Sequence, residues 1–136
     1  MNLIPDKLPD LPSDLLELAL SDLKKAEQSP NIQINMGVWH VYTYKKCRVC
    51  LAGACLHYQC NLSDMQSVFR TECAPSLANK MEALDALRIG AINHAMGVLG
   101  RTTKLRKRNI THYYVNRAAF YAELEQLVLD LRAEGN

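Results

Sequence analysis

The chain has 136 residues, of which 49% are hydrophobic and 22% charged, and these ordinary globular values exclude wholesale disorder and predict one domain over residues 1–136. The formal net charge of +2 excludes a protein that coats nucleic acid over its whole surface, although residues 101–117 carry six bases and no acid. The sequence lacks a signal-peptide start and a membrane-length apolar run, and with five cysteines it predicts a cytoplasmic protein with reduced thiols.

The N-terminal part predicts an extended lead-in, a helix and a β element. Three prolines within residues 1–12 prevent a continuous helix there. Ser13 suits an N-cap, and the leucine-rich face that follows predicts a helix over about 14–28. Alternating apolar residues then predict a β-hairpin or an extended strand over residues 31–44.

The rest of the chain predicts helices. Residues 45–60 are expected to be helical, with small side chains that let another helix approach closely, although Gly53 costs about 1 kcal/mol relative to alanine. Further helices are expected before Gly90, over 92–99, and from 110 or 116 to 133, with Asn116 the favoured cap. The fold class is therefore mainly α: a compact bundle of four to six helices with a minor β element and a basic connector over 101–109.

The stretch KKCRVCLAGACLHYQC, residues 45–60, holds four of the five cysteines. Cys47 and Cys50 form a CxxC pair, and with His40 upstream they are the zinc ligands expected if a metal is present. A second pair at the usual spacing is missing, and His57 stands isolated. Buried thiols are therefore favoured over zinc and over a thioredoxin-like redox pair, and the prediction is no cofactor, with zinc as the alternative.

The basic segment offers a contact surface. Cations can neutralise phosphates and tyrosines can stack on bases, so nucleic acid is a possible partner, but no known nucleic-acid-binding motif surrounds the segment. A solvated loop between helices, which can meet an acidic protein surface, is therefore favoured over nucleic-acid binding. The candidate partner-binding or nucleic-acid-binding residues are Arg101, Lys104, Arg106, Lys107, Arg108, Tyr113 and Tyr114.

Catalytic signals are weak throughout the sequence. A cysteine, His40 and Asp64 can be combined on paper, but their spacing does not support a catalytic set, and there is no glycine-rich phosphate loop. We therefore predict that the protein is not an enzyme and has no catalytic residues.

Three fragments resemble a group of small uncharacterised proteins of tailed bacteriophages and prophages. They are MGVWH (36–40), CRVCLAGA (47–54) and LDALRIG (84–90), and the resemblance covers roughly residues 13–100. In that group the position of Cys55 is usually an ordinary apolar residue, which weakens a four-cysteine metal site here. The resemblance implies a phage context and transfers no site residue.

These observations support three functional hypotheses. The first is a small phage protein that acts in the host cytosol by binding and inhibiting a host complex, such as a defence system, through the basic segment. The second is a nucleic-acid-binding regulator that uses the same segment. The third is a zinc-stabilised binding module built on Cys47 and Cys50. Membrane partners are not expected, and the oligomeric state is left open.

Overall fold

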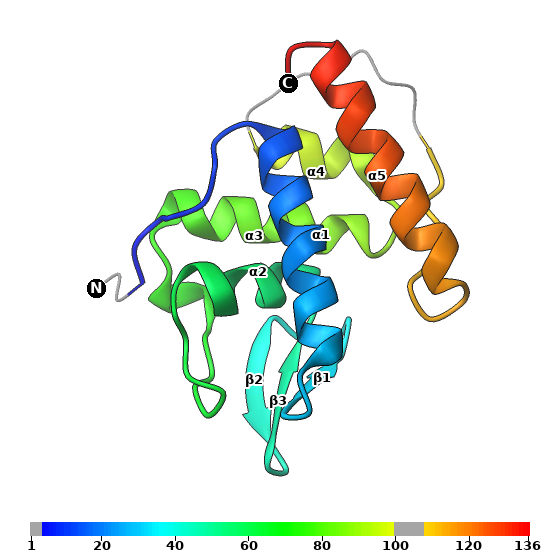
Figure 1. Cartoon of the computed structure of the whole chain (residues 1–136). Coiled ribbons are helices and arrows are strands. Elements are labelled where there is room, and N and C mark those ends of the chain that lie inside the picture. The colour runs from blue at the N-terminus through cyan, green and yellow to red at the C-terminus, as the bar shows by residue number, and fades with distance from the viewer. Residues whose placement is uncertain (1–3, 100–107) are drawn as a thin grey trace.

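The computed structural model describes residues 4–99 and 108–136, and it confirms a mainly α fold with a minor β element (Figure 1). The helices are α1 (Pro12–Gln28), α2 (Leu51–Gln59), α3 (Pro75–Leu87), α4 (Ile92–Val98) and α5 (Arg117–Ala133), with a 3-10 turn at Arg70–Glu72. The strands are β1 (Ile32–Ile34), β2 (His40–Thr43) and β3 (Lys46–Val49). Among the described residues, no helix is long and apolar enough to cross a membrane.

The helix boundaries follow local capping. The expected cap at Ser13 is wrong: α1 starts at Pro12, whose ring suits the first helical position, and the buried Ser13 donates to the carbonyl of Asn136 instead. The expected cap at Asn116 is confirmed, since its side chain accepts the backbone N–H of Ala119 at 3.0 Å. This cap starts α5 at Arg117.

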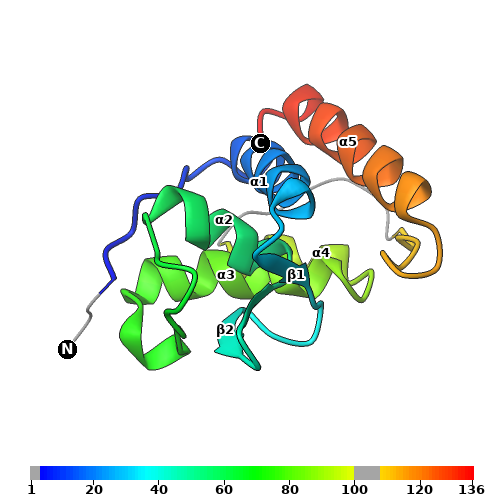
Figure 2. The same cartoon turned by 60° about the horizontal axis from the view of Figure 1, so that its bottom comes forward.

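The helices pack around one hydrophobic core. Helix α1 lies against both α2 and α5, and α3 lies against α2 and α4. Figure 1 shows the sheet at one end of the helices, and Figure 2 shows α5 at the edge opposite the N-terminal segment. All the largest fully buried side chains except that of Met36 come from the five helices, so the core is mostly helix against helix.

The sheet differs from the predicted β element. Its strand order is β1-β3-β2, with β1 parallel to β3 and β2 antiparallel to β3. The hairpin therefore turns at Tyr44 and Lys45, and its second strand lies in the stretch that was predicted to be helical. The prediction of a helix from residue 45 is wrong because residues 46–49 alternate outward and inward: Cys47 and Val49 are buried, and Lys46 is exposed.

Helix α2 lies directly on the start of β2. A methyl group built on Gly53 would lie 1.4 Å from the carbonyl oxygen of Trp39 and 2.5 Å from its carbonyl carbon. The same oxygen accepts the backbone N–H of Cys50 at 3.3 Å. The close approach expected at Gly53 is therefore made by the backbone of Trp39, the residue before β2, and not by another helix, and only glycine fits there.

We expect Gly53→Ala to lower the free energy of unfolding by about 3 kcal/mol or more, because strand β2 has to move away from α2 and the core packing around it is lost. Gly97→Ala is the matched control: it also lies within a helix, and its added methyl group would meet nothing within 4 Å. The control should be neutral or stabilising by up to about 1 kcal/mol. Urea unfolding of both variants measures the difference, and equal stabilities would contradict the packing described here.

Candidate metal centre

Three buried side chains from three elements meet between the sheet and α2. They are His40 of β2, Cys47 of β3 and His57 of α2, and their candidate ligand atoms all lie within 4.8 Å of one another. His40 and Cys47 are 0% exposed and His57 is 9% exposed. The antiparallel register pairs Tyr42 with Cys47, which sets Cys47 on the same face of the sheet as His40.

The two imidazole rings face each other through their nitrogens. His40 Nε2 lies 2.8 Å from His57 Nδ1, and the ring centroids are 5.1 Å apart. The thiol of Cys47 lies 3.6 Å from the same His40 Nε2. Three possible ligand atoms, two nitrogens and a sulfur, therefore converge on one point in the core.

The remaining ring nitrogens point to oxygen acceptors. His40 Nδ1 lies 2.6 Å from the backbone carbonyl oxygen of Gln66, and His57 Nε2 lies 3.3 Å from a carboxylate oxygen of Asp64. The loop that carries both acceptors is held to β2, since the backbone N–H of Val68 donates to the His40 carbonyl at 2.9 Å. Histidines that bind metals usually donate their outer N–H to such a carbonyl or carboxylate.

The chain of contacts from Gln66 through the two histidines to Asp64 is one proton short. From the Gln66 carbonyl through both rings to Asp64 there are three contacts, and each needs one proton. Two neutral imidazoles carry two protons, and the outer oxygen acceptors use both. The facing nitrogens of His40 and His57 are then two lone pairs at 2.8 Å. The Cys47 thiol proton can serve only one of these nitrogens, so the pair needs a further proton or a metal cation.

Burial disfavours the further proton. Desolvation, together with the neighbouring His57, lowers the pKa of His40 to about 4. Desolvation also lowers the pKa of His57, against the opposing effect of Asp64. In the absence of a metal, burial raises the pKa of Cys47 to about 11. At neutral pH the two rings are therefore neutral, and their facing nitrogens are free to bind a metal ion.

The donor set suits zinc. Zinc binds histidine nitrogen at about 2.0–2.1 Å and cysteine sulfur at about 2.3 Å, so in a tetrahedron two nitrogens lie roughly 3.3 Å apart and a nitrogen and a sulfur roughly 3.6 Å. The separation of 3.6 Å between Cys47 and His40 fits this geometry as it stands. The two nitrogens at 2.8 Å need to open by roughly half an ångström.

The candidate ligands expected from the sequence are only partly brought together. His40 and Cys47 belong to the group, but Cys50 does not: its buried sulfur caps α2, accepting the backbone N–H of Gly53 at 3.4 Å. His57, which the sequence left isolated, takes its place. The spacing of Cys47 and His57 matches no usual ligand motif, but His57 lies one helical turn after Gly53, on the face of α2 that meets β2.

The basic segment is described only in part. Arg101, Lys104, Arg106 and Lys107 lie outside the described residues. Arg108 pairs with Asp130. The ring of Tyr113 is buried edge-on against Phe120 and its hydroxyl donates to Glu27, so this ring is not available for stacking on a base.

Tyr114 is exposed, and its hydroxyl accepts the backbone N–H of Met36 at 2.9 Å. The inhibitory role of the basic segment and its phage context stay predictions.

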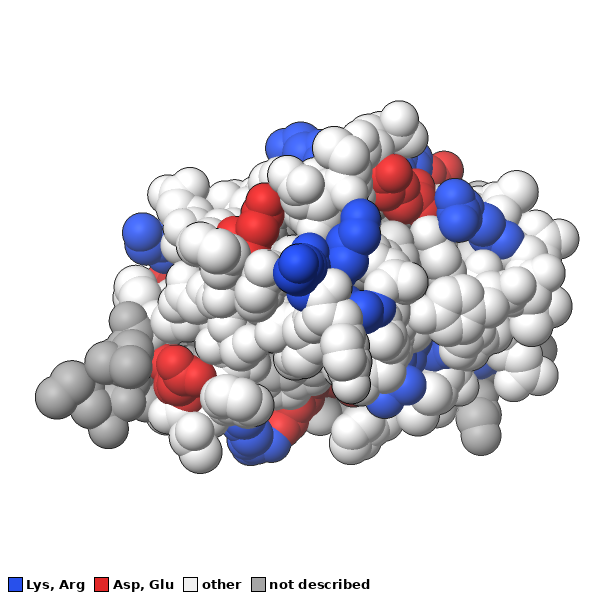
Figure 3. All heavy atoms as spheres, turned by 90° about the horizontal axis from the view of Figure 1, so that it is seen from below, with Lys and Arg blue, Asp and Glu red and all other residues white. Residues whose placement is uncertain are grey.

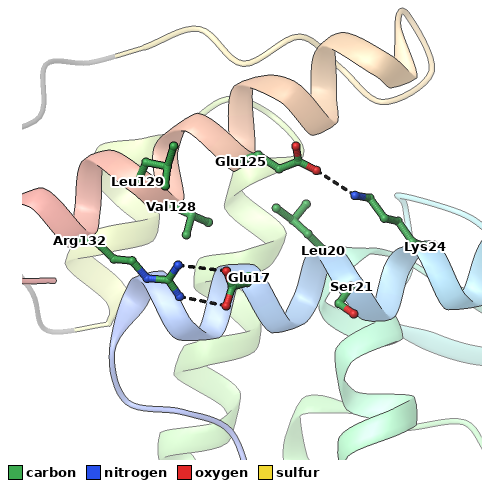
Figure 4. Close-up of a pocket in the computed structure, with 8 residues that line it drawn as sticks. All are labelled: Glu17, Leu20, Ser21, Lys24, Glu125, Val128, Leu129 and Arg132. Carbon is green, nitrogen blue, oxygen red and sulfur yellow. Dashed lines mark hydrogen bonds and ion pairs between the residues drawn. The ribbon is translucent and has the colours of Figure 1, made fainter.

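A hollow of about 380 Å³ also lies between α1 and α5 (Figure 4). Leu20, Val128 and Leu129 supply its apolar surface. Arg132 binds Glu17 at 2.9 Å and Lys24 binds Glu125 at 2.8 Å, so the charges at this hollow pair across the two helices. These ion pairs join α1 to α5. Because the charged groups at the hollow already pair with each other, the metal centre is the stronger candidate site.

Comparisons of the chain with protein-family models, with curated proteins and with solved structures found no match. The geometry of the site is therefore the basis for the function proposed below.

The stability of the metal-free protein is expected to depend on pH through His40. Its pKa is lower in the folded state than in the unfolded state, so its contribution is complete above the unfolded value of 6.5 and is lost as the pH falls towards about 4. Between about pH 7 and about pH 5 the loss is about 2 kcal/mol for this one histidine. Urea unfolding in a chelator at the two pH values measures it.

Two single variants, each with one histidine replaced by glutamine, test whether His40 causes this pH dependence. His40→Gln should reduce the difference between the two pH values, and His94→Gln, at an exposed position of α4, should leave it unchanged. Stability that rises as the pH falls would contradict the prediction.

Proposed function

We propose that this protein is a zinc-stabilised binding module in which His40, Cys47 and His57 hold one zinc ion. The observation that carries the proposal is the pair of facing imidazole nitrogens, 2.8 Å apart, whose outer nitrogens both meet oxygen acceptors. A zinc ion replaces the missing proton and takes the Cys47 thiolate as its third ligand. The nearby Asp64 carboxylate and Gln66 carbonyl then orient the two rings.

The three protein ligands leave the fourth position of the zinc ion to a water molecule, and the burial of the site favours a structural role over a catalytic one. The three ligand side chains are buried, which keeps a substrate away from the metal. Together they connect β2, β3 and α2, and the outer contacts add the loop that carries Asp64 and Gln66. Because ligand binding stabilises only the folded chain, zinc at 100 times its dissociation constant would add about 2.7 kcal/mol.

We expect protein purified without chelators to contain about one zinc ion per chain, measured by elemental mass spectrometry. Cys47→Ser should lose the ion because it removes the thiolate. Cys50→Ser is the matched control, since serine at that position can still cap α2 and Cys50 lies outside the ligand group. A zinc-free wild-type protein whose melting temperature does not change on adding zinc would refute the proposal.

Zinc retained in Cys47→Ser and lost in Cys50→Ser would instead assign the metal to a different ligand set.

Removing the carboxylate behind His57 should weaken the site without abolishing it. We expect Asp64→Asn to lower zinc affinity by about 10- to 100-fold, because the imidazole loses its charged acceptor. Competition against a chromophoric chelator measures the affinity. Asp85→Asn, on α3 and paired with Arg88, is the control that removes one carboxylate elsewhere and should leave the affinity unchanged.

A further inference from the structure

We propose that the outer face of the sheet, opposite the metal centre, binds single-stranded nucleic acid. The proposal goes beyond zinc binding and rests on different side chains. The surface, here called the outer face, consists of the β2–β3 hairpin residues that point away from the core and the adjoining hollow next to Val41.

The hairpin cations Lys45, Lys46 and Arg48 have no carboxylate partner among the described residues, whereas Arg70 at the adjoining hollow pairs with Glu82. Residues 28–63 contain no aspartate or glutamate, whereas Lys45, Lys46 and Arg48 follow one another along the hairpin. The groups that accept their hydrogen bonds are neutral: Lys46 donates to the Pro30 carbonyl, and Arg48 donates to Thr43 and Gln33. Figure 3, which views the end of the molecule towards which the hairpin points, shows Lys and Arg side chains grouped near its centre.

Aromatic side chains border these cations. A hollow of about 300 Å³ is lined by Val38, Trp39, Val41, Val68, Phe69 and Arg70. Val41 pairs with Arg48 across the hairpin, so the hollow and the cations share one surface. Phe69 is 62% exposed, and Tyr44 at the tip is 91% exposed with the Arg48 guanidinium 6.0 Å from its ring centroid.

The turn of the hairpin contains Tyr44 and Lys45, two residues with long side chains, at positions where small residues are usual. Tyr44 has a φ of 50° and Lys45 a φ of 60°, the left-handed conformations of a two-residue turn that favours Asn-Gly. Both residues adopt this strained backbone conformation at exposed positions outside the core. Their side chains project from the tip as one aromatic ring and one cation.

Aromatic rings beside unpaired cations suit a single strand better than a duplex. Unpaired bases can stack on Phe69, Trp39 and Tyr44 while the phosphates meet Lys45, Lys46 and Arg48. In a duplex the base faces are already stacked, and only the charge contacts with the phosphates remain. The outer face is therefore expected to bind single-stranded RNA and single-stranded DNA alike, and both more tightly than duplex DNA.

The chain supplies its own reporter, because Trp39 is its one tryptophan and lines the hollow. The probe is an oligonucleotide of about 10 nucleotides, used as RNA, as DNA of the same sequence and as the DNA duplex. We expect both single strands to quench Trp39 fluorescence and to raise the anisotropy of a labelled oligonucleotide, with at least a few-fold weaker binding of the duplex. Binding without any change in Trp39 emission would place the strand elsewhere and overturn the proposal.

Variants test the outer face directly. Lys45→Glu/Lys46→Glu should weaken binding and reduce the slope of log K against log salt by about 1.4, which corresponds to two phosphate contacts on a single strand. Lys7→Glu/Lys24→Glu makes the same change in net charge at exposed positions away from the hairpin and should have a much smaller effect. Phe69→Ala should weaken binding roughly 5- to 100-fold through lost stacking.

Two further measurements distinguish loss of the outer face from loss of zinc and from binding through the basic segment. Zinc content is determined for every variant, so weakened binding with the metal retained supports the outer face independently of the metal centre. Arg106→Glu/Lys107→Glu tests the basic segment. If that variant abolishes binding while Lys45→Glu/Lys46→Glu does not, or if no single strand binds at all, the proposal is wrong.

Discussion

The contact between Gly53 and the Trp39 carbonyl determines how the helices meet the sheet. At this point the backbone of α2 lies so close to β2 that no side chain fits between them. His40 follows Trp39 and begins β2, and His57 lies one turn after Gly53 in α2. The distance between the two imidazoles is therefore set by the backbones, and a larger residue at position 53 would separate the rings as well as weaken the core.

Local sequence signals predicted the helices well and the sheet poorly. The leucines of α1 and the Asn116 cap of α5 act within their own segments, so periodicity and capping were enough to find them. Strand β3 has only four residues, and its inward positions are Cys47 and Val49, which pack equally well in a helix. Its pairing with β1 and β2 depends on tertiary contacts, and the Tyr44–Lys45 turn lacks the residues that usually mark a hairpin.

The candidate site could be predicted only in part for the same reason. His40 and Cys47 stood out because Cys47 belongs to the CxxC pair and His40 lies upstream of it, but the same pair led to Cys50, whose sulfur caps a helix. His57 and its acceptor Asp64 become neighbours of His40 through the packing of α2 and of the following loop. Spacing along the chain carries no signal for a contact made by that packing, and the proton count becomes visible only when the distances are known.

Strands β2 and β3 contribute residues to both the buried metal centre and the outer face. The register of the two strands places these residues on opposite sides of the sheet. Side chains alternate across a strand, so Cys47 reaches the metal centre while Lys46 and Arg48 lie on the outer face. A shift of one residue would exchange the two sets, burying cations and exposing the thiol. Ligands from β2, β3 and α2 would oppose such a shift when joined by one ion, because each ligand must stay within bonding distance. Zinc on the inner face would thus also fix the positions of the cations on the outer face. The metal would then support the binding of nucleic acid without touching it.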